Sequence, residues 1–319
     1  MLISQYLGFI NKIKKDVLRY KEAIGLSVTD PGFALEVRQS KHLVYEEYFG
    51  VKDQKTKAMI NSDTIFLMAS LAKPVLANFI LENLNYFPHK YINEYLYSPY
   101  GKLTIGDLLR HKSGLPDYLF FLSKKKINEM NIDELVNAIF LQELNFQPGK
   151  KVEYSNSGYI ILTKIIENIF KDNYSNVIWN FYSDLGIKFH FKNESNFASN
   201  YKNSGGIYKK IIHNRYITGW GDGLLYSSVS EYVKLFKDNL KYRQLLQSGY
   251  GKVGNFYYHI GGAPGVDSLF CYLEEMDLEI VLICNSTNNT VLLSDLVLDS
   301  IEGKPVMSKA NDRGINKSF

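Results

Sequence analysis

Apolar residues recur at helical spacing near the start of the chain. In residues 4–24 the apolar side chains share one face of a helix, and lysines occupy the opposite face. The apolar face consists of Tyr6, Ile10, Ile13, Val17 and Leu18. This pattern predicts a helix that packs on the core.

Strand patterns, in contrast, occur at both ends of the chain. Residues 33–37 and 42–48 predict a hairpin joined by the polar turn Gln39-Ser40-Lys41. From residue 71 to about 245 the spacing is mainly helical, and loops rich in Gly, Pro and Asn interrupt it. Strand patterns return at 256–260, 268–273 and 279–284, followed by an apolar helix from about 290 to 301.

These patterns predict an α/β (α+β) fold with a mixed, mainly antiparallel sheet, flanking helices and an inserted helical domain. Residues 1–84 and 222–302 are expected to form a discontinuous sheet domain, and residues 85–221 a mainly helical one. Residues 303–319 are expected to be a loose tail. An active site is expected in the cleft between the two domains.

Composition narrows the class of protein. The 319 residues are 45% hydrophobic and 22% charged, which is typical of a folded globular chain and excludes general disorder. The 37 basic and 33 acidic residues leave a net charge of +4 without a long basic block, so nucleic acid is not an expected partner. No run approaches the roughly 20 apolar residues of a membrane span.

The start of the chain indicates the compartment. It has no basic segment before its short apolar run and no small-residue cleavage site after it, so a cytoplasmic location is expected. No His, Cys or Asp cluster has metal-ligand spacing, and we expect neither a metal nor a cofactor.

The two cysteines lie in predicted strands of one hairpin. Folding that hairpin about Met276 sets Cys271 opposite Val281, which makes a disulfide to Cys284 geometrically awkward. Both cysteines are therefore expected to be reduced core residues.

A serine nucleophile needs a base within hydrogen-bonding reach, and Ser-x-x-Lys on a helix supplies one. Three such tetrads begin at Ser70, Ser123 and Ser199. Only Ser70 follows a dense apolar run and opens an apolar helix, so Lys73 is expected to be buried with a lowered pKa. Ser70 is expected at the helix N-terminus, where the backbone favours negative charge. The alternative is that Ser70 merely caps this helix.

Two further motifs extend the candidate site. Tyr-x-Asn begins at Tyr91, Tyr154, Tyr174 and Tyr201, and only Tyr154 stands on a loop between a Pro-Gly turn and an amphipathic helix. His259-Ile260-Gly261 is the only His-x-Gly in the chain, and Gly262 follows it, which permits close approach of a substrate to the backbone. A purely structural role for His259 is the alternative.

In this order, Ser70…Lys73, Tyr154…Asn156 and His259…Gly261 resemble the class C β-lactamase-like branch of the penicillin-binding serine hydrolases. That branch includes esterases, D-aminopeptidases and transesterases. Longer segments carry the resemblance, which spans roughly residues 24–302. They are LLRHKSGLPDY (108–118), FQPG (146–149), GDGL (221–224) and HIGGAPG (259–265).

The resemblance implies a β-lactamase/transpeptidase-like fold and a role for each motif residue. Ser70 resembles the acylated nucleophile, with Lys73 and Tyr154 as the proton-transfer pair. Asn156 and Gly261 resemble substrate-binding positions, and the Ser70 and Gly262 N–H groups resemble the oxyanion hole. His259 is the fourth expected catalytic residue, and it stands where β-lactamases usually have lysine. His111 and Asp117 are expected to be architectural.

The expected function is a serine hydrolase that acts on an ester or amide of a small molecule or peptide through acyl-Ser70. A largely neutral His259 would hold a carboxylate-bearing β-lactam less well than lysine does. Two alternatives stay open: an acyltransferase or cyclase that uses the same acyl-enzyme, and a catalytically silent binding protein. β-Lactam resistance needs export and is disfavoured. The substrate and the oligomeric state are left open.

Overall fold

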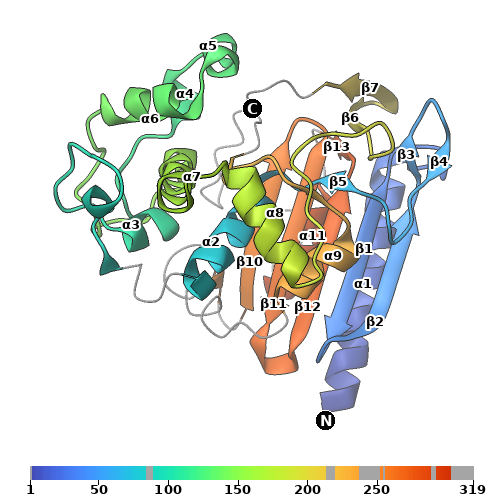
Figure 1. Ribbon diagram of the computed structural model, residues 1–319. Coiled ribbons are helices and arrows are strands. Elements are labelled where there is room, and N and C mark those ends of the chain that lie inside the picture. Colours follow the sequence, from blue (N-terminus) through green and yellow to red (C-terminus); the bar gives the residue numbers. More distant parts are fainter. Residues whose placement is uncertain are drawn as a thin grey trace.

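A six-stranded antiparallel sheet forms the centre of the molecule (Figure 1). The computed structural model describes residues 2–83, 89–212, 220–236, 252–253, 256–288 and 292–302, so the expected tail lies outside the described residues. The strand order is β2-β1-β12-β11-β10-β9. The strands are β1 (Phe33–Gln39), β2 (His42–Phe49), β9 (Lys252–Val253), β10 (Phe256–Ala263), β11 (Val266–Leu273) and β12 (Leu278–Cys284).

The two ends of the chain meet inside this sheet. β1 pairs with β12 in antiparallel register, from Phe33 opposite Cys284 to Gln39 opposite Leu278. The predicted sheet with contributions from both ends is therefore confirmed, as is the mixed α/β class.

Helices cover both faces of the sheet (Figure 1). One face packs against α1 (Leu2–Ile24) and α11 (Leu293–Glu302), and the other against α2 (Ala72–Asn83), α8 (Tyr174–Asp184) and α9 (Val229–Tyr232). Side chains alternate accordingly, because successive strand residues point to opposite faces. In β1, for example, Phe33 and Leu35 face α1, whereas Ala34 faces the opposite core.

The predicted first helix is present, but one residue of its buried face is corrected. Leu18 is 55% exposed, whereas Tyr20 is 2% exposed. The buried stripe continues from Ile13 and Val17 to Tyr20, because steps of three and four residues stay on one helical face. Leu18 follows Val17 directly and therefore points away from that stripe.

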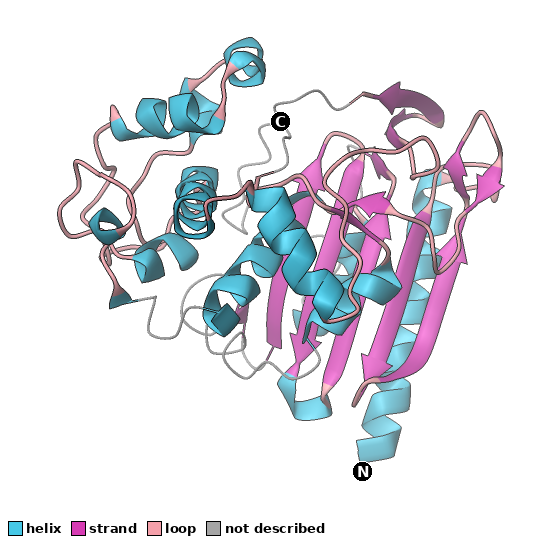
Figure 2. Ribbon diagram, viewed as in Figure 1, coloured by secondary structure: helices cyan, strands magenta, loops and turns pink. Residues whose placement is uncertain are grey.

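The remaining described helices gather on one side of the molecule, away from the large sheet (Figure 2). Helix α7 is central among them and packs against α3, α6 and α8. Side-chain caps start several of these helices; Thr104 and Asp107, for example, form a reciprocal capping box before α3. The helices are α3 (Ile105–Leu109), α4 (Tyr118–Phe121), α5 (Lys124–Glu129), α6 (Ile132–Phe140) and α7 (Asn156–Phe170), with the 3₁₀ turn η3 (Ile92–Glu94).

The structure adds strands that the sequence pattern did not predict. β6 (Asn200–Ser204) and β7 (Ile207–Ile211) form a hairpin inside the range expected to be mainly helical, and β13 (Ser286–Asn288) pairs in parallel with β6. Their polar sequences, NYKNS and IYKKI, show no clear apolar alternation. Two further pairs are β3 (Val51–Asp53) with β4 (Ala58–Met59), and β5 (Phe66–Leu67) with β8 (Tyr226–Ser227).

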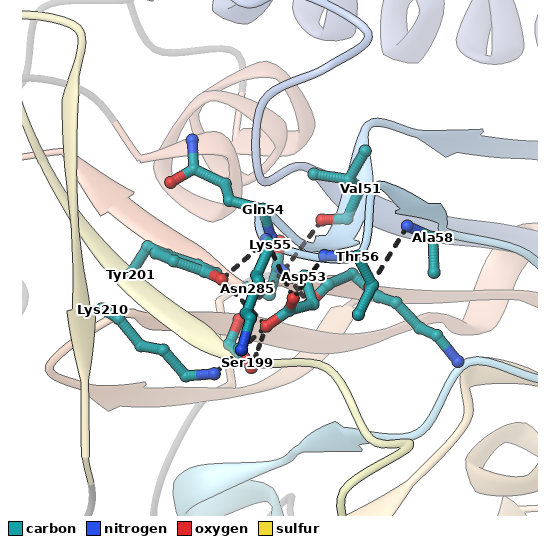
Figure 3. A network of polar contacts seen from close by, with 11 residues as sticks. Val51, Asp53, Gln54, Lys55, Thr56, Ala58, Ser199, Tyr201, Lys210 and Asn285 are labelled. Carbon is teal, nitrogen blue, oxygen red and sulfur yellow. Dashed lines mark hydrogen bonds and ion pairs between the residues drawn. The ribbon is translucent and has the colours of Figure 1, made fainter.

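Asp53 ties the β6–β7 hairpin to the main body (Figure 3). Its Oδ2 accepts hydrogen bonds from Ser199 Oγ at 2.8 Å and Lys210 Nζ at 3.1 Å. Burial by itself would raise the pKa of the Asp53 carboxyl. The hydrogen bonds from Ser199, Lys210 and the Thr56 N–H outweigh this effect, so the pKa lies well below its ordinary value. The carboxylate therefore stays charged and holds the hairpin in place.

The register of the cysteine hairpin differs from the prediction by one residue. Cys271 lies opposite Ile280, not Val281, and Cys284 lies opposite Asp267. The connection consists of η5 (Glu274–Met276) and Asp277, which centres the turn slightly before Met276. Both cysteines are buried and free, as expected.

Within the described ranges, every helix is too short or too polar to cross a bilayer.

Candidate active site

Ser70 lies on a tight turn between a short strand and α2. It is the middle residue of the 3₁₀ turn η1 (Ala69–Leu71), which leads directly into α2. The sequence predicted Ser70 at the N-terminus of the helix, and the structure places it in the turn just before that helix. Ala69 has a φ of +49°, a left-handed conformation that residues with a Cβ adopt infrequently. Strained turns of this kind are often found where a side chain is presented for chemistry.

Two predicted side chains, those of Lys73 and Tyr154, converge on the Ser70 hydroxyl. Lys73 Nζ lies 3.1 Å from Ser70 Oγ, and Tyr154 Oη lies 2.9 Å from the same atom. Lys73 is one helical turn beyond Ser70, whereas Tyr154 comes from the loop before α7. Proton exchange among the three groups is therefore possible without an intervening water.

The Lys73 amine is fully enclosed. Its residue is 0% exposed, and Nζ lies 5.0 Å above the Tyr154 ring and 5.7 Å above the Tyr159 ring. Burial lowers the pKa of Lys73 to about 8, while the carboxylates of Asp222 and Asp117 oppose the shift. About a tenth of the amine is then neutral at pH 7 and able to accept a proton.

The loop that carries Tyr154 is held by His111 and Asp117. His111 Nδ1 accepts the Ser155 N–H at 3.2 Å, and the His111 ring packs on Tyr154 with centroids 4.5 Å apart. Asp117 Oδ2 accepts the Asn156 N–H at 3.1 Å and the Asn156 Nδ2 group at 2.7 Å. These contacts fit the architectural role expected for His111 and Asp117, which stays a prediction.

Asn156 lies beside the phenol as well. Its Oδ1 is 3.5 Å from Tyr154 Oη, so the amide links Asp117 to the tyrosine. Its expected contact with substrate stays a prediction.

Strand β10 brings His259 and Gly261 to the same place. A Cβ added at Gly261 would lie 2.2 Å from Ser268 Oγ, 2.5 Å from the Met68 carbonyl oxygen and 3.2 Å from the Ser70 nitrogen. Only a glycine allows the strand to lie this close to the nucleophile's turn. Gly262 is the next residue on β10, opposite Asp267 on β11.

His259 is neutral in this setting. Burial and the positive charge of Lys73 lower the pKa of His259 to about 3, although a hydrogen bond with the Ser70 backbone opposes the shift. This lowered pKa agrees with the largely neutral imidazole expected at pH 7, which stays a prediction.

Gly261→Ala tests the close packing of β10 on the turn. The added methyl group meets backbone as well as a side chain, so β10 must move away, and we expect a loss of about 1–3 kcal/mol in the free energy of unfolding. Denaturant unfolding measures this loss. Gly101→Ala is the control, because a Cβ there has no atom within 4 Å. A Gly261→Ala protein as stable as the control would contradict the packing.

The other Ser-x-x-Lys and Tyr-x-Asn motifs have different places in the fold. Ser123 caps helix α5, and its Oγ accepts the Lys126 N–H at 3.3 Å. Ser199 and Tyr201 both donate to Asp53 in the network described above (Figure 3). Tyr174 is buried at the start of α8, and Tyr91 precedes η3.

Two residues of the site, Asp222 and Tyr118, had no role predicted from the sequence. Lys73 Nζ donates to the Asp222 backbone oxygen, and Tyr118 Oη donates to Asp222 Oδ2 at 2.7 Å. The available signal was a carboxylate between two glycines, Gly221-Asp222-Gly223, in a segment otherwise flanked by apolar residues. Among the described residues, no group of three His, Cys, Asp or Glu side chains is arranged to hold a metal ion.

Comparisons with known proteins identify relatives of this chain. A family model described as Beta-lactamase matches residues 27–249. Penicillin-binding protein 4* of Bacillus subtilis (strain 168) is 32% identical over 146 residues, 43% of this chain and 32% of that protein. Protein flp of Staphylococcus aureus (strain NCTC 8325 / PS 47) is 26% identical over 160 residues, 47% of this chain and 32% of that protein. The match spans about a third of the length of each relative.

Solved structures share the whole fold. EstCE1, described as a hydrolase with promiscuous acyltransferase activity, superposes with a TM-score of 0.74 at 13% identity, over 92% of this chain and 99% of that one. D-amino acid amidase from Ochrobactrum anthropi SV3 gives a TM-score of 0.72 at 19% identity, over 93% and 99%. At these identities the likeness concerns the fold.

Proposed function

Because the chain belongs to the Beta-lactamase family, we propose that it is a serine hydrolase that acts on an ester or amide through a covalent ester on Ser70. The observation that carries the proposal is the convergence of a buried amine and a phenol on one hydroxyl. Lys73 Nζ and Tyr154 Oη lie 3.1 and 2.9 Å from Ser70 Oγ. An amine whose pKa is lowered to about 8 by burial is a suitable proton acceptor near neutral pH.

In the proposed acylation, Ser70 Oγ forms a bond to the substrate carbonyl carbon while its proton passes to Lys73, directly or through Tyr154. The carbonyl oxygen becomes an oxyanion, for which the Ser70 and Gly262 N–H groups are the proposed donors. The proximity of Gly261 to the Ser70 nitrogen supports this arrangement. The tetrahedral intermediate then collapses, and the leaving alcohol or amine takes the proton back from Lys73 or Tyr154.

Deacylation repeats these steps with water. Water gives its proton to the same pair, attacks the acyl carbon, and Ser70 leaves with the returned proton. Every group needed for the two half-reactions is thus supplied by Ser70, Lys73, Tyr154 and the two backbone donors.

The neutral state of His259 bears on the substrate. Its pKa of about 3 leaves no imidazolium at neutral pH, so His259 supplies no positive charge for a substrate carboxylate. We infer that the preferred substrate is an ester or amide of a small molecule or peptide without a carboxylate at this position. Penicillins carry such a carboxylate and are expected to acylate Ser70 more slowly.

Adduct mapping with two probes tests the proposal. The protein is incubated with a neutral p-nitrophenyl ester or with a penicillin, and the modified peptide is identified by mass spectrometry. We expect an adduct on Ser70 and none on Ser123 or Ser199, and faster acylation by the neutral ester. An adduct on another serine would contradict the assignment of Ser70 as the nucleophile. No adduct across a broad ester and amide panel would favour the silent binding protein.

The acceptor of the acyl group is a separate question for the same assay. EstCE1 is described as having promiscuous acyltransferase activity, so hydrolysis and transfer to an added alcohol are measured side by side. We propose water as the principal acceptor.

A cytoplasmic location stays a prediction.

A further inference from the structure

The buried residue Asp222 contacts Lys73 through its backbone oxygen, and its carboxylate has no part in the proposed acyl transfer. Asp222 is 7% exposed, and its neighbours Tyr118 and Lys73 are 2% and 0% exposed. Its backbone oxygen accepts a hydrogen bond from Lys73 Nζ, and its Oδ2 accepts one from Tyr118 Oη at 2.7 Å. Any residue has a backbone oxygen, so the contact with Lys73 does not by itself explain a carboxylate here.

The loop that contains Asp222 is held in place by contacts that do not involve its carboxylate. The Gly221 N–H donates to Thr163 Oγ1 at 2.9 Å, and a Cβ at Gly221 would lie 2.2 Å from Leu76 Cδ2. The loop thus packs closely between α2 and α7, and the absence of a side chain at Gly221 permits this packing. The Gly223 N–H adds a bond to the Trp220 oxygen at 3.3 Å. An uncompensated buried carboxylate is strongly unfavourable, which indicates that Asp222 has an electrostatic partner.

The titratable groups around Lys73 identify that partner. Those that face or electrostatically couple to its amine are Tyr154, Tyr159, His111, His259, Asp117 and Asp222. Both histidines have lowered pKa values and are neutral, so the charges that oppose the ammonium come from the two aspartates. Asp117 also accepts N–H groups of Leu119 and Asn156, which occupy both its oxygens.

We propose that the Asp222 carboxylate, oriented by the Tyr118 hydroxyl, is the buried counter-charge of the Lys73 ammonium and a positioning residue for the proton transfer from Ser70. The part about catalysis rests on the proposed function, whereas the charge coupling is a property of the folded chain alone. When Lys73 accepts the Ser70 proton, the ammonium that forms is stabilised by Asp222.

The mutual influence of the two charges supports this assignment. Burial raises the pKa of Asp222 to about 6, and the Lys73 charge opposes the increase. Burial lowers the pKa of Lys73 to about 8, and Asp222 is the foremost group that opposes the decrease. Between pH 6 and 8 both groups are mainly charged. Loss of one charge is therefore expected to shift the titration of the other by about one pH unit or more.

The test is a direct titration of the Lys73 amine by NMR in the full chain labelled with ¹³C-lysine, with Lys73→Met to assign the signal. We expect a midpoint near pH 8 in the wild type, and one about one unit lower in Asp222→Asn. Tyr118→Phe removes the hydrogen bond to the carboxylate. It should give a smaller shift in the same direction, and no further shift when combined with Asp222→Asn.

Asp16→Asn is the matched control. Asp16 is a fully buried carboxylate on α1, across the sheet from the site, and the variant should leave the Lys73 midpoint unchanged. In Asp222→Asn, the acid limb of the kcat/KM profile for a neutral ester should move to lower pH together with the NMR midpoint. A merely structural role of Asp222 would not cause this joint shift.

An unchanged Lys73 midpoint in folded Asp222→Asn overturns the proposal. If Asp222→Asn does not fold, Tyr118→Phe decides, and an unchanged midpoint there has the same meaning. A midpoint that shifts as expected in a protein that forms no Ser70 adduct supports the counter-charge and refutes the hydrolase function instead.

Discussion

Ser70→Ala is expected to lower ester hydrolysis by about 10⁴- to 10⁶-fold, because it removes the atom that would form the acyl bond. The substitution deletes one oxygen and leaves the backbone of η1 able to keep its conformation. The lost hydrogen bonds are those with Lys73 Nζ and Tyr154 Oη. Stopped-flow or steady-state release of p-nitrophenol measures the rate, and intact mass measures the acyl-enzyme.

Ser123→Ala is the matched control for this prediction. Ser123 also begins a Ser-x-x-Lys tetrad, but its Oγ caps helix α5. Loss of the cap should cost about 1 kcal/mol of stability and leave the rate of ester hydrolysis unchanged. The opposite pattern of effects in the two variants separates a nucleophile from a capping serine. Activity of Ser70→Ala within tenfold of the wild type would contradict the proposed function.

Lys73→Met is expected to lower acylation by about 10³- to 10⁴-fold. Methionine has a similar length and fits an apolar environment, so the variant should fold, but it has no group that accepts the Ser70 proton. The pH profile provides a second measurement. Acylation by the wild type should rise with pH as Lys73 loses its proton near pH 8, and Lys73→Met should lack this rise.

Lys126→Met is the matched control, because Lys126 is the lysine of the tetrad on α5 and is exposed. It should keep both the rate and the rise near pH 8. A Lys73→Met protein that retains the rise would assign it to another group, and would exclude Lys73 as the proton acceptor.

Much of the fold was accessible from local patterns. The amphipathic first helix and the late strands each have a periodicity that a short window reveals, and the structure confirms them within a few residues. The β6–β7 hairpin was missed because its side chains are polar and its position depends on Asp53, a residue about 150 positions away. The secondary-structure propensity of a short stretch of sequence contains no information about such a distant partner.

The exact register of the cysteine hairpin shows a second kind of limit. Its two strands were predicted, but the pairing of Cys271 with Ile280 depends on a turn that contains Asp277 in the left-handed conformation. A change of half a residue in the centre of a turn moves every cross-strand partner by one position.

By itself, the sequence determined which of three serine tetrads stands in an apolar setting, which tyrosine lies on a constrained loop, and the order in which the motifs occur. These are local properties, since burial and loop chemistry follow from neighbouring residues. Only the tertiary structure decided that Ser70, Lys73, Tyr154 and the β10 backbone meet, and that the backbone oxygen of Asp222 contacts Lys73. Distances and charge couplings between remote segments depend on how helices pack on the sheet, and the sum of many weak contacts sets that packing.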